Sequence, residues 1–257
     1  MRVIDRYAYN NALRMVDPAQ KFLLAILVVL LVLVLNRPIS SLLAIAWMVG
    51  LTVGMAKIRA GVFGRILLAE ATFLMLTTIG VVVSISTQQP ALIWQTKVGP
   101  LWFSASPDTL WQGFQLVTRA LGAASALNFL ALTTPLTDII ALLQRWRVPD
   151  YLIDLMTVMY RFIFVLLDTL EQMLVAQESR LGYQTSYRRA MGNAGQVGAR
   201  LFVNSFQRSR LLETALAARG YDGELRVLSP TYISFPYFWV VMIGILGTLI
   251  LGRLIFG

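Results

Sequence analysis

Long apolar runs constrain this chain more than any other feature of its sequence. Five segments consist mainly of Leu, Val, Ile, Ala, Met and Phe: residues 21–35, 39–56, 66–86, 110–133 and 232–256. A helix needs about 20 apolar residues to cross the hydrocarbon core of a bilayer, so neighbouring residues must complete the first run. Charged residues make up 14% of the chain, against about a quarter in soluble domains. We predict an all-α integral membrane protein with about five transmembrane helices.

Lysine and arginine predict how these spans are oriented. Of the 22 Lys and Arg, four lie in residues 1–21, three in residues 57–65 and eleven in residues 134–230. Five spans would place all three segments on the same side, and cytoplasmic loops carry the excess of Lys and Arg. We therefore predict a cytoplasmic N-terminus and an external C-terminus. The predicted divisions are a membrane domain of four spans (1–133), a cytoplasmic module of amphipathic coupling helices (134–230) and a last transmembrane helix (231–257).

Glu70 and Arg119 are ionisable residues that fall inside predicted spans. Such groups are costly in lipid and usually face the interior of a helix bundle. We expect a structural role for them, with pairing to each other as one candidate and a transport pathway as the alternative. The external segment 87–109 is predicted to be a loop anchored at the headgroups by its aromatic residues, with a binding role as the alternative. These residues are Trp94, Trp102 and Phe103.

The residue types that are missing exclude several kinds of site. The chain has no cysteine and no histidine, which rules out disulfides and thiolate nucleophiles and argues against a transition-metal site. It also lacks the G-x-x-x-x-G-K-[ST] phosphate loop, so it does not bind ATP in that way. We predict no catalytic residue, no cofactor and no metal site. Because the net charge of +9 arises mainly in loops between spans, we predict membrane lipid as a partner and no nucleic acid.

Residues 134–230 are predicted to form helices outside the lipid, because charged residues interrupt their apolar stretches. Asp154, Arg161 and Asp168 recur every seven residues within 151–177, which places them on one stripe of a helix. An amphipathic helix lying under the membrane accommodates such a stripe. A buried sixth span that faces a polar partner is the alternative.

Prolines and polar residues divide this segment further. A short helix is predicted to follow Thr134-Pro135 and to end at Trp146, because Pro149 disfavours helical backbone in the residue before it. Residues 183–195 are polar and are predicted to be a linker. The next helix is predicted to carry Arg200, Arg208 and Arg210 on one face. Its opposite face is apolar and comprises Val197, Leu201, Phe202, Leu212 and Leu216.

The two long helices of the segment have the same ending. The first closes with Ala176-Gln177-Glu178-Ser179-Arg180-Leu181-Gly182, and the second with Ala215-Leu216-Ala217-Ala218-Arg219-Gly220. Glycine commonly terminates helices. A small residue one turn before the arginine lets a helix end enter a groove, where the guanidinium can bind a carboxylate through two hydrogen bonds. The alternative is a cation placed against the helix dipole, worth about 0.3–1 kcal/mol. The predicted docking residues are Ala176, Ser179, Arg180, Leu181, Ala215, Ala218, Arg219 and Gly220.

These endings and other motifs resemble one known family over nearly the whole chain. It is the transmembrane T component of energy-coupling-factor (ECF) transporters, most closely the CbiQ type of cobalt importers. The most specific matches are the two X-Arg-X signatures, Ser179-Arg180-Leu181 and Ala218-Arg219-Gly220, although Leu181 before the Gly departs from the commonest form. The other matching residues are Ile4-Asp5-Arg6-Tyr7-Ala8-Tyr9, Asp17-Pro18 with Lys21, Thr133-Thr134-Pro135 and Tyr160-Arg161-Phe162.

The resemblance implies the non-catalytic energy-coupling subunit of an ECF-type ABC importer, multi-pass in the bacterial cytoplasmic (inner) membrane. Its substrate would be the cobalt ion that cobalamin biosynthesis uses. Arg180 and Arg219 would each dock in one of two CbiO-like ATPase subunits, which bind the ATP. A separate CbiM-like membrane subunit, with or without a small CbiN-like subunit, would bind the substrate. Closure of the ATPases would move the two helices relative to each other and tilt the substrate-binding subunit.

Three alternatives stay open at this point. The first is a T component for nickel or a vitamin. The second is an ordinary ABC importer permease, because Glu213-Thr214-Ala215 with Gly220 resembles its Glu-Ala-Ala loop, although the Gly comes one residue late. The third is a membrane enzyme such as a lipid-modifying transferase. Its catalytic groups would be drawn from Glu70, Asp108, Asp138, Asp154 and Asp168.

Overall fold

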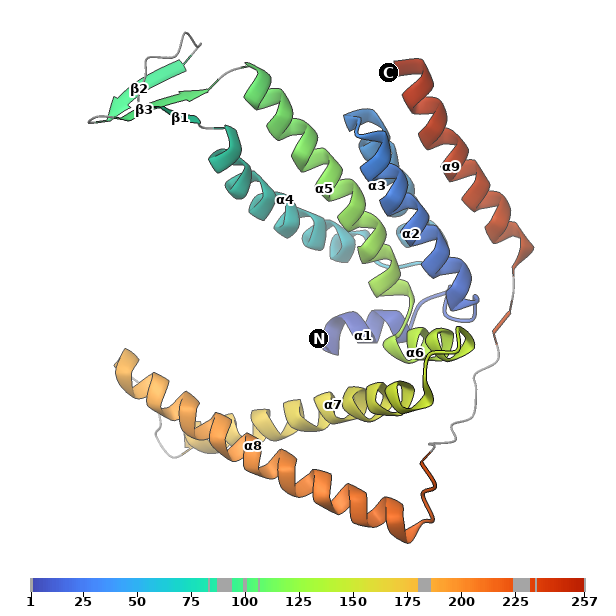
Figure 1. Ribbon diagram of the computed structural model, residues 1–257, viewed down its shortest axis with the longest axis vertical. Helices are drawn as coiled ribbons and strands as arrows, with labels where there is room; N and C mark the ends of the chain where they lie inside the picture. Colours follow the sequence, from blue (N-terminus) through green and yellow to red (C-terminus); the bar gives the residue numbers. More distant parts are fainter. Residues whose placement is uncertain are drawn as a thin grey trace. The chain divides into compact units, whose positions relative to one another are not determined.

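The computed structural model divides the chain into two compact units (Figure 1). Unit 1 comprises Met1–Pro135 and Pro230–Gly257, and unit 2 comprises Leu136–Ser229. The structure describes residues 2–82, 84–86, 94–98, 101–105, 107–179, 186–223, 232–233 and 235–256.

Helices make up most of both units. In unit 1 they are α1 (Arg2–Tyr9), α2 (Pro18–Leu35), α3 (Pro38–Gly50), α4 (Ala60–Val82), α5 (Pro107–Thr133) and α9 (Pro236–Phe256), and α3 continues as a π-helix, η1 (Leu51–Met55). In unit 2 they are α6 (Leu136–Arg145), α7 (Asp150–Ser179) and α8 (Tyr187–Ala218).

Four helical segments are long and apolar enough to cross a membrane: Pro18–Leu35, Pro38–Met55, Ala60–Gly80 and Pro107–Thr133. They confirm the prediction of an all-α, multi-pass membrane protein, although the third segment begins six residues earlier than predicted. In α9 the described apolar segment, Pro236–Gly252, is shorter than the other four. The fifth span therefore stays a prediction. Among the described helices, α7 and α8 do not meet the same criterion.

A small sheet lies between α4 and α5, where the sequence predicted a loop. Strands β1 (Ser84–Ser86), β2 (Trp94–Val98) and β3 (Leu101–Ala105) pair antiparallel in the order β1-β3-β2. Ser84 lies opposite Ser104, and Trp94 lies opposite Ala105. Aromatic and β-branched residues favour strands, and two such runs lie close together here. The side chains of Trp94, Trp102 and Phe103 lie outside the described residues, so their anchoring role stays a prediction.

Helix α5 is the centre of unit 1, because it packs against α2, α3 and α4, while α9 packs against α2 and α3 (Figure 1). The core includes Val28 of α2, Met48 of α3, Phe129 of α5 and Ile245 of α9, which are all fully buried. Gly122 permits the close approach of α5 to its neighbours. A Cβ atom at this position would lie 3.2 Å from both Ser41 Cβ and Val32 Cγ1.

We expect Gly122→Val to destabilise the protein by about 1–3 kcal/mol, because overfilling a packed core forces side chains and backbone apart. Gly244→Val in α9 is the matched control, since a Cβ atom there has nothing within 4 Å. The midpoint of thermal unfolding of the detergent-purified protein measures both effects. Equal midpoints for the two variants would contradict the close packing of α5.

Glu70 and Arg119 do not pair with each other, as the sequence had suggested they could. Asn128 Nδ2 donates to both carboxylate oxygens of Glu70, each at 2.9 Å. Arg119 Nη1 donates to Asn36 Oδ1 at 2.8 Å. Asn128 and Arg119 lie nine residues apart on α5, which is half a turn in projection, so they face different neighbours. Each ionisable group has instead an amide partner from another part of the bundle.

Candidate functional site

Helix α8 ends in a glycine-terminated cap that fixes the position of Arg219. Gly220 has a φ of 73°, a left-handed conformation that glycine adopts without a steric penalty. Its N–H donates to Ala217 O at 3.1 Å, and the N–H of Tyr221 donates to Leu216 O at 3.0 Å. These two bonds form a Schellman motif. The helix therefore ends where the sequence predicted, with Arg219 as its C-cap residue.

The side chains around this end are available to a partner. Ala215, Ala218, Arg219 and Gly220 are all exposed. Ala215 lies one helical turn before Arg219, so nothing larger than a methyl group stands beside the root of the arginine on that side. A guanidinium at the tip of a helix with small neighbours can reach into a recess of another protein, as the sequence pattern had suggested.

The corresponding end of α7 is described only in part. The helix extends to Ser179, whose hydroxyl donates to Val175 O at 2.9 Å. Ala176 and Ser179 are exposed. Arg180 and Leu181 lie outside the described residues, so their position stays a prediction.

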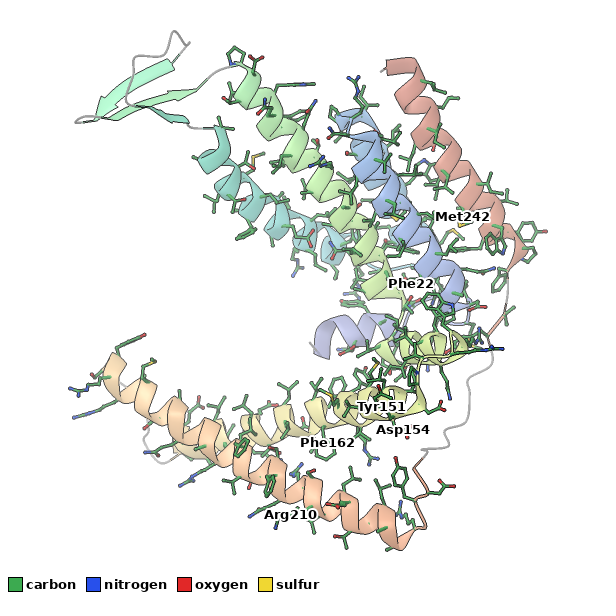
Figure 2. All side chains as sticks on the ribbon, viewed as in Figure 1. Phe22, Tyr151, Asp154, Phe162, Arg210 and Met242 are labelled. Carbon is green, nitrogen blue, oxygen red and sulfur yellow. The ribbon has the colours of Figure 1, made fainter. Side chains whose placement is uncertain are left out.

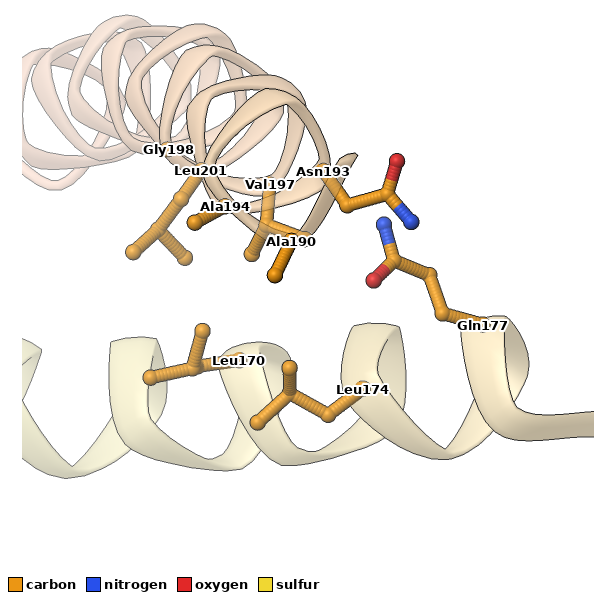
Figure 3. Close-up of a pocket in the computed structure, with 9 residues that line it drawn as sticks. All are labelled: Leu170, Leu174, Gln177, Ala190, Asn193, Ala194, Val197, Gly198 and Leu201. Atoms are coloured by element: carbon orange, nitrogen blue, oxygen red, sulfur yellow. The ribbon is translucent and has the colours of Figure 1, made fainter. Parts of the chain in front are cut away.

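Within unit 2, α7 and α8 pack against each other, and a pocket lies between them. Ala190, Ala194 and Gly198 of α8 lie over Leu170 and Leu174 of α7, and Val197 is buried beside them (Figure 3). The small side chains do not fill the space between the helices, which leaves a pocket of about 360 Å³.

A polar contact also joins the end of α8 to α7. The hydroxyl of Tyr221, directly after the cap, donates to Asp154 Oδ2 at 3.3 Å. Asp154 is half-buried, whereas Arg161 and Asp168 of the predicted stripe are exposed. The three residues of the stripe therefore differ in exposure, and the first of them contacts Tyr221, after the end of α8. Only its place directly after the terminating glycine could have pointed to Tyr221 from the sequence.

Two sequence predictions for α8 are wrong. Residues 187–195, predicted as linker, are helical, because α8 begins at Tyr187. The glycines of this stretch each cost about 1 kcal/mol in a helix, and packing of the adjacent alanines against α7 offsets that cost. Phe202, predicted on the same apolar face as Val197, is 70% exposed, whereas Val197 is buried.

The outer side of α8 carries apolar residues together with arginine. Phe202, Val203 and Phe206 are exposed, and the Arg210 guanidinium lies 4.8 Å from the centre of the Phe206 ring. Arg210 is labelled on α8 in Figure 2. Helix α8 is therefore apolar on two sides, one against α7 and one exposed.

Comparison with known proteins places most of this chain in one family. Residues 9–230 match the family model CbiQ, described as cobalt transport protein. A cobalt transport protein CbiQ from Rhodobacter capsulatus is 38% identical over 60% of this chain and 61% of its own length. A transmembrane protein EcfT of the energy-coupling factor transporter from Staphylococcus aureus is 25% identical over 87% of this chain and 85% of its own. A putative fused cobalt transport protein CbiMQ from Methanocorpusculum labreanum is 26% identical over 86% of this chain and 37% of its own length.

Proposed function

Because this chain belongs to the CbiQ family of cobalt transport proteins, we propose that it is the energy-coupling T subunit of an ECF-type importer that takes up cobalt ions. As a member of that family it is a non-catalytic, multi-pass membrane subunit. ATP hydrolysis and substrate recognition then belong to other subunits. The chain transmits the motion of the ATPases to the subunit that carries the substrate.

One observation carries this proposal: an exposed arginine at a rigid helix end with small exposed neighbours. The Schellman cap at Gly220 holds Arg219 in place, and the guanidinium is the side chain best suited to bidentate bonds with a carboxylate. Arg219 and, from the matching sequence, Arg180 each dock in a groove of one of two CbiO-like ATPase subunits. Two such contacts allow the relative motion of two ATPases to act on α7 and α8.

The proposed substrate-binding partner is a CbiM-like membrane subunit. The relative in which CbiM and CbiQ are fused supports association between the two kinds of chain. Fusion requires the two proteins to lie in the same membrane and within reach of each other. The distribution of Lys and Arg supports a cytoplasmic position for unit 2, a cytoplasmic N-terminus and an external C-terminus in the bacterial inner membrane.

Cobalt as the substrate rests on the family and not on a site in this chain. The sequence contains no histidine or cysteine to bind the ion, so its ligands are placed in the partner. Nickel is the nearest alternative, because it prefers similar ligands.

Reconstituted transport tests the proposal. We expect uptake of radioactive cobalt into proteoliposomes to require three components: this chain, the ATPases and the CbiM-like subunit. Omission of the CbiM-like subunit should reduce uptake to the level of empty liposomes while the ATPases still co-purify with this chain. Uptake by this chain and the ATPases alone would mean that the protein is an ordinary permease.

A further inference from the structure

Two chain connections join unit 2 to unit 1, and both bind the same short segment of unit 1. The first connection follows Thr133 at the end of α5, and the second leads through Ile233 into α9. Residues 11–17, between α1 and α2, hydrogen-bond to both. All of these bonds lie inside unit 1.

Lys21 holds the first connection. Its side chain is fully buried, and its ammonium group donates to Thr133 O and to Leu13 O, each at 3.1 Å. Asn11 Nδ2 donates to the same Thr133 carbonyl at 3.3 Å. Carbonyl groups at the end of a helix have no partner within that helix, so these donors satisfy the last carbonyl of α5 before the chain turns into α6.

Backbone pairing holds the second connection. The Ile233 N–H donates to Met15 O at 2.9 Å, and the Asp17 N–H donates to Ile233 O at 3.3 Å. Val16 and Ile233 thus form a parallel bridge. The side chain of Ile233 is 51% exposed, so hydrogen bonding and not side-chain burial holds this residue in place.

The segment that receives these bonds is itself fixed to the bundle. The Ala12 N–H donates to Ala56 O at 3.2 Å, Leu13 and Val16 are buried, and Asp17 caps α2 by accepting from the Ala19 N–H at 3.0 Å. A buried ammonium group is costly unless it is fully hydrogen-bonded. If the Lys21 side chain served only to fill space, an apolar residue would do so at a lower free-energy cost.

We propose that residues 11–17 and Lys21 form a clamp that fixes both connections of unit 2 to the bundle, so that movement of α7 and α8 reaches the membrane part of the protein. Lys21 is a positioning residue in this scheme. The coupling role rests on the proposed function, whereas the clamp is a property of this chain alone. Without the clamp, movement of unit 2 would be absorbed by the two connections.

Hydrogen exchange tests the clamp in the purified chain. We expect Lys21→Met to accelerate exchange in peptides that contain the Asp17 and Ile233 amides by about tenfold or more, because loss of a charged donor loosens the segment they bind. Arg14→Met is the control: it removes the same charge close to Lys21 in the sequence, but the Arg14 side chain is exposed and donates to Tyr9 O, so exchange should stay near that of the unmodified chain. Unchanged exchange in Lys21→Met would overturn the clamp, whether or not the chain binds ATPases.

Coupling is tested in the assembled transporter by the amount of cobalt taken up per ATP hydrolysed. Lys21→Met and Ile233→Pro each remove clamp donors, and we expect each to lower this ratio by about threefold or more while ATPase recovery stays near that of the unmodified chain. Ile233→Ala keeps the N–H and should leave the ratio unchanged.

An unchanged ratio in both clamp variants, or a loss of ATPase recovery that accounts for the whole effect, would overturn the coupling role. If the unmodified chain recovers no ATPase, the proposed function fails and the exchange measurement still decides the clamp.

Discussion

Reversing both signature arginines, by Arg180→Glu with Arg219→Glu, is expected to abolish recovery of the ATPase subunits with this chain. In the proposed docking, each reversal would replace a charge-assisted pair with a carboxylate by repulsion between like charges, and disruption of such a pair costs about 2–5 kcal/mol. Under the proposed docking, each ATPase is held at one helix end, so either single reversal should lower recovery in part. Affinity purification of the complex from membranes, followed by quantification of the ATPases, measures the effect.

Arg208→Glu is the matched control for this prediction. Arg208 lies on α8 and is exposed, so its reversal makes the same change of charge on the same helix without altering its end. Recovery with Arg208→Glu should stay close to that of the unmodified chain. Full recovery with both signature arginines reversed would exclude the docking role, and an equal loss with Arg208→Glu would point to a general effect of charge.

Asn128→Leu is expected to have the largest effect on stability, about 2–4 kcal/mol. It removes the amide that donates to both Glu70 oxygens and leaves a carboxylate in a membrane-spanning helix without that partner. A fall in the denaturation midpoint of the detergent-purified protein would show the loss.

The double variant Glu70→Leu with Asn128→Leu distinguishes loss of the hydrogen bonds from a change in how the two side chains fill space. Removal of both polar groups leaves no unsatisfied carboxylate, so the double variant should be more stable than Asn128→Leu alone. Equal stability of the two variants would mean that the hydrogen bonds between α4 and α5 contribute little.

The sequence predicted the elements with strong local signals. The spans follow from apolar length, and the end of α8 follows from the pattern Ala218-Arg219-Gly220, whose glycine takes the left-handed conformation. Local signals failed where tertiary contacts decide the outcome. Residues 187–195 contain glycines that predict a linker, yet packing against α7 keeps them helical. Glu70 and Arg119 have opposite charges, but Glu70 binds Asn128 of α5, and Arg119 lies on the opposite side of that helix.

The end of α8 in the candidate site was predictable for the same reason, whereas the matching end of α7 extends beyond the described residues. The small residues and arginine at the end of α8 could be read directly, because a helix end is set by few residues. The clamp could not be found in this way. Its bonds join residues 11–17 and Lys21 to Thr133 and Ile233, which are far away in the sequence, and two of these bonds involve only backbone atoms that carry no sequence signal.

The pocket between α7 and α8 has a thermodynamic consequence for assembly. Interdigitated side chains normally fix the angle at which two helices cross, but Ala194 and Gly198 leave space opposite Leu174. We therefore expect the isolated chain to sample several crossing angles of similar free energy. Partners that require one angle must then offset the loss of conformational entropy when they bind. Under the proposed docking, affinity measured with the isolated chain would therefore understate the strength of the contacts at the helix ends.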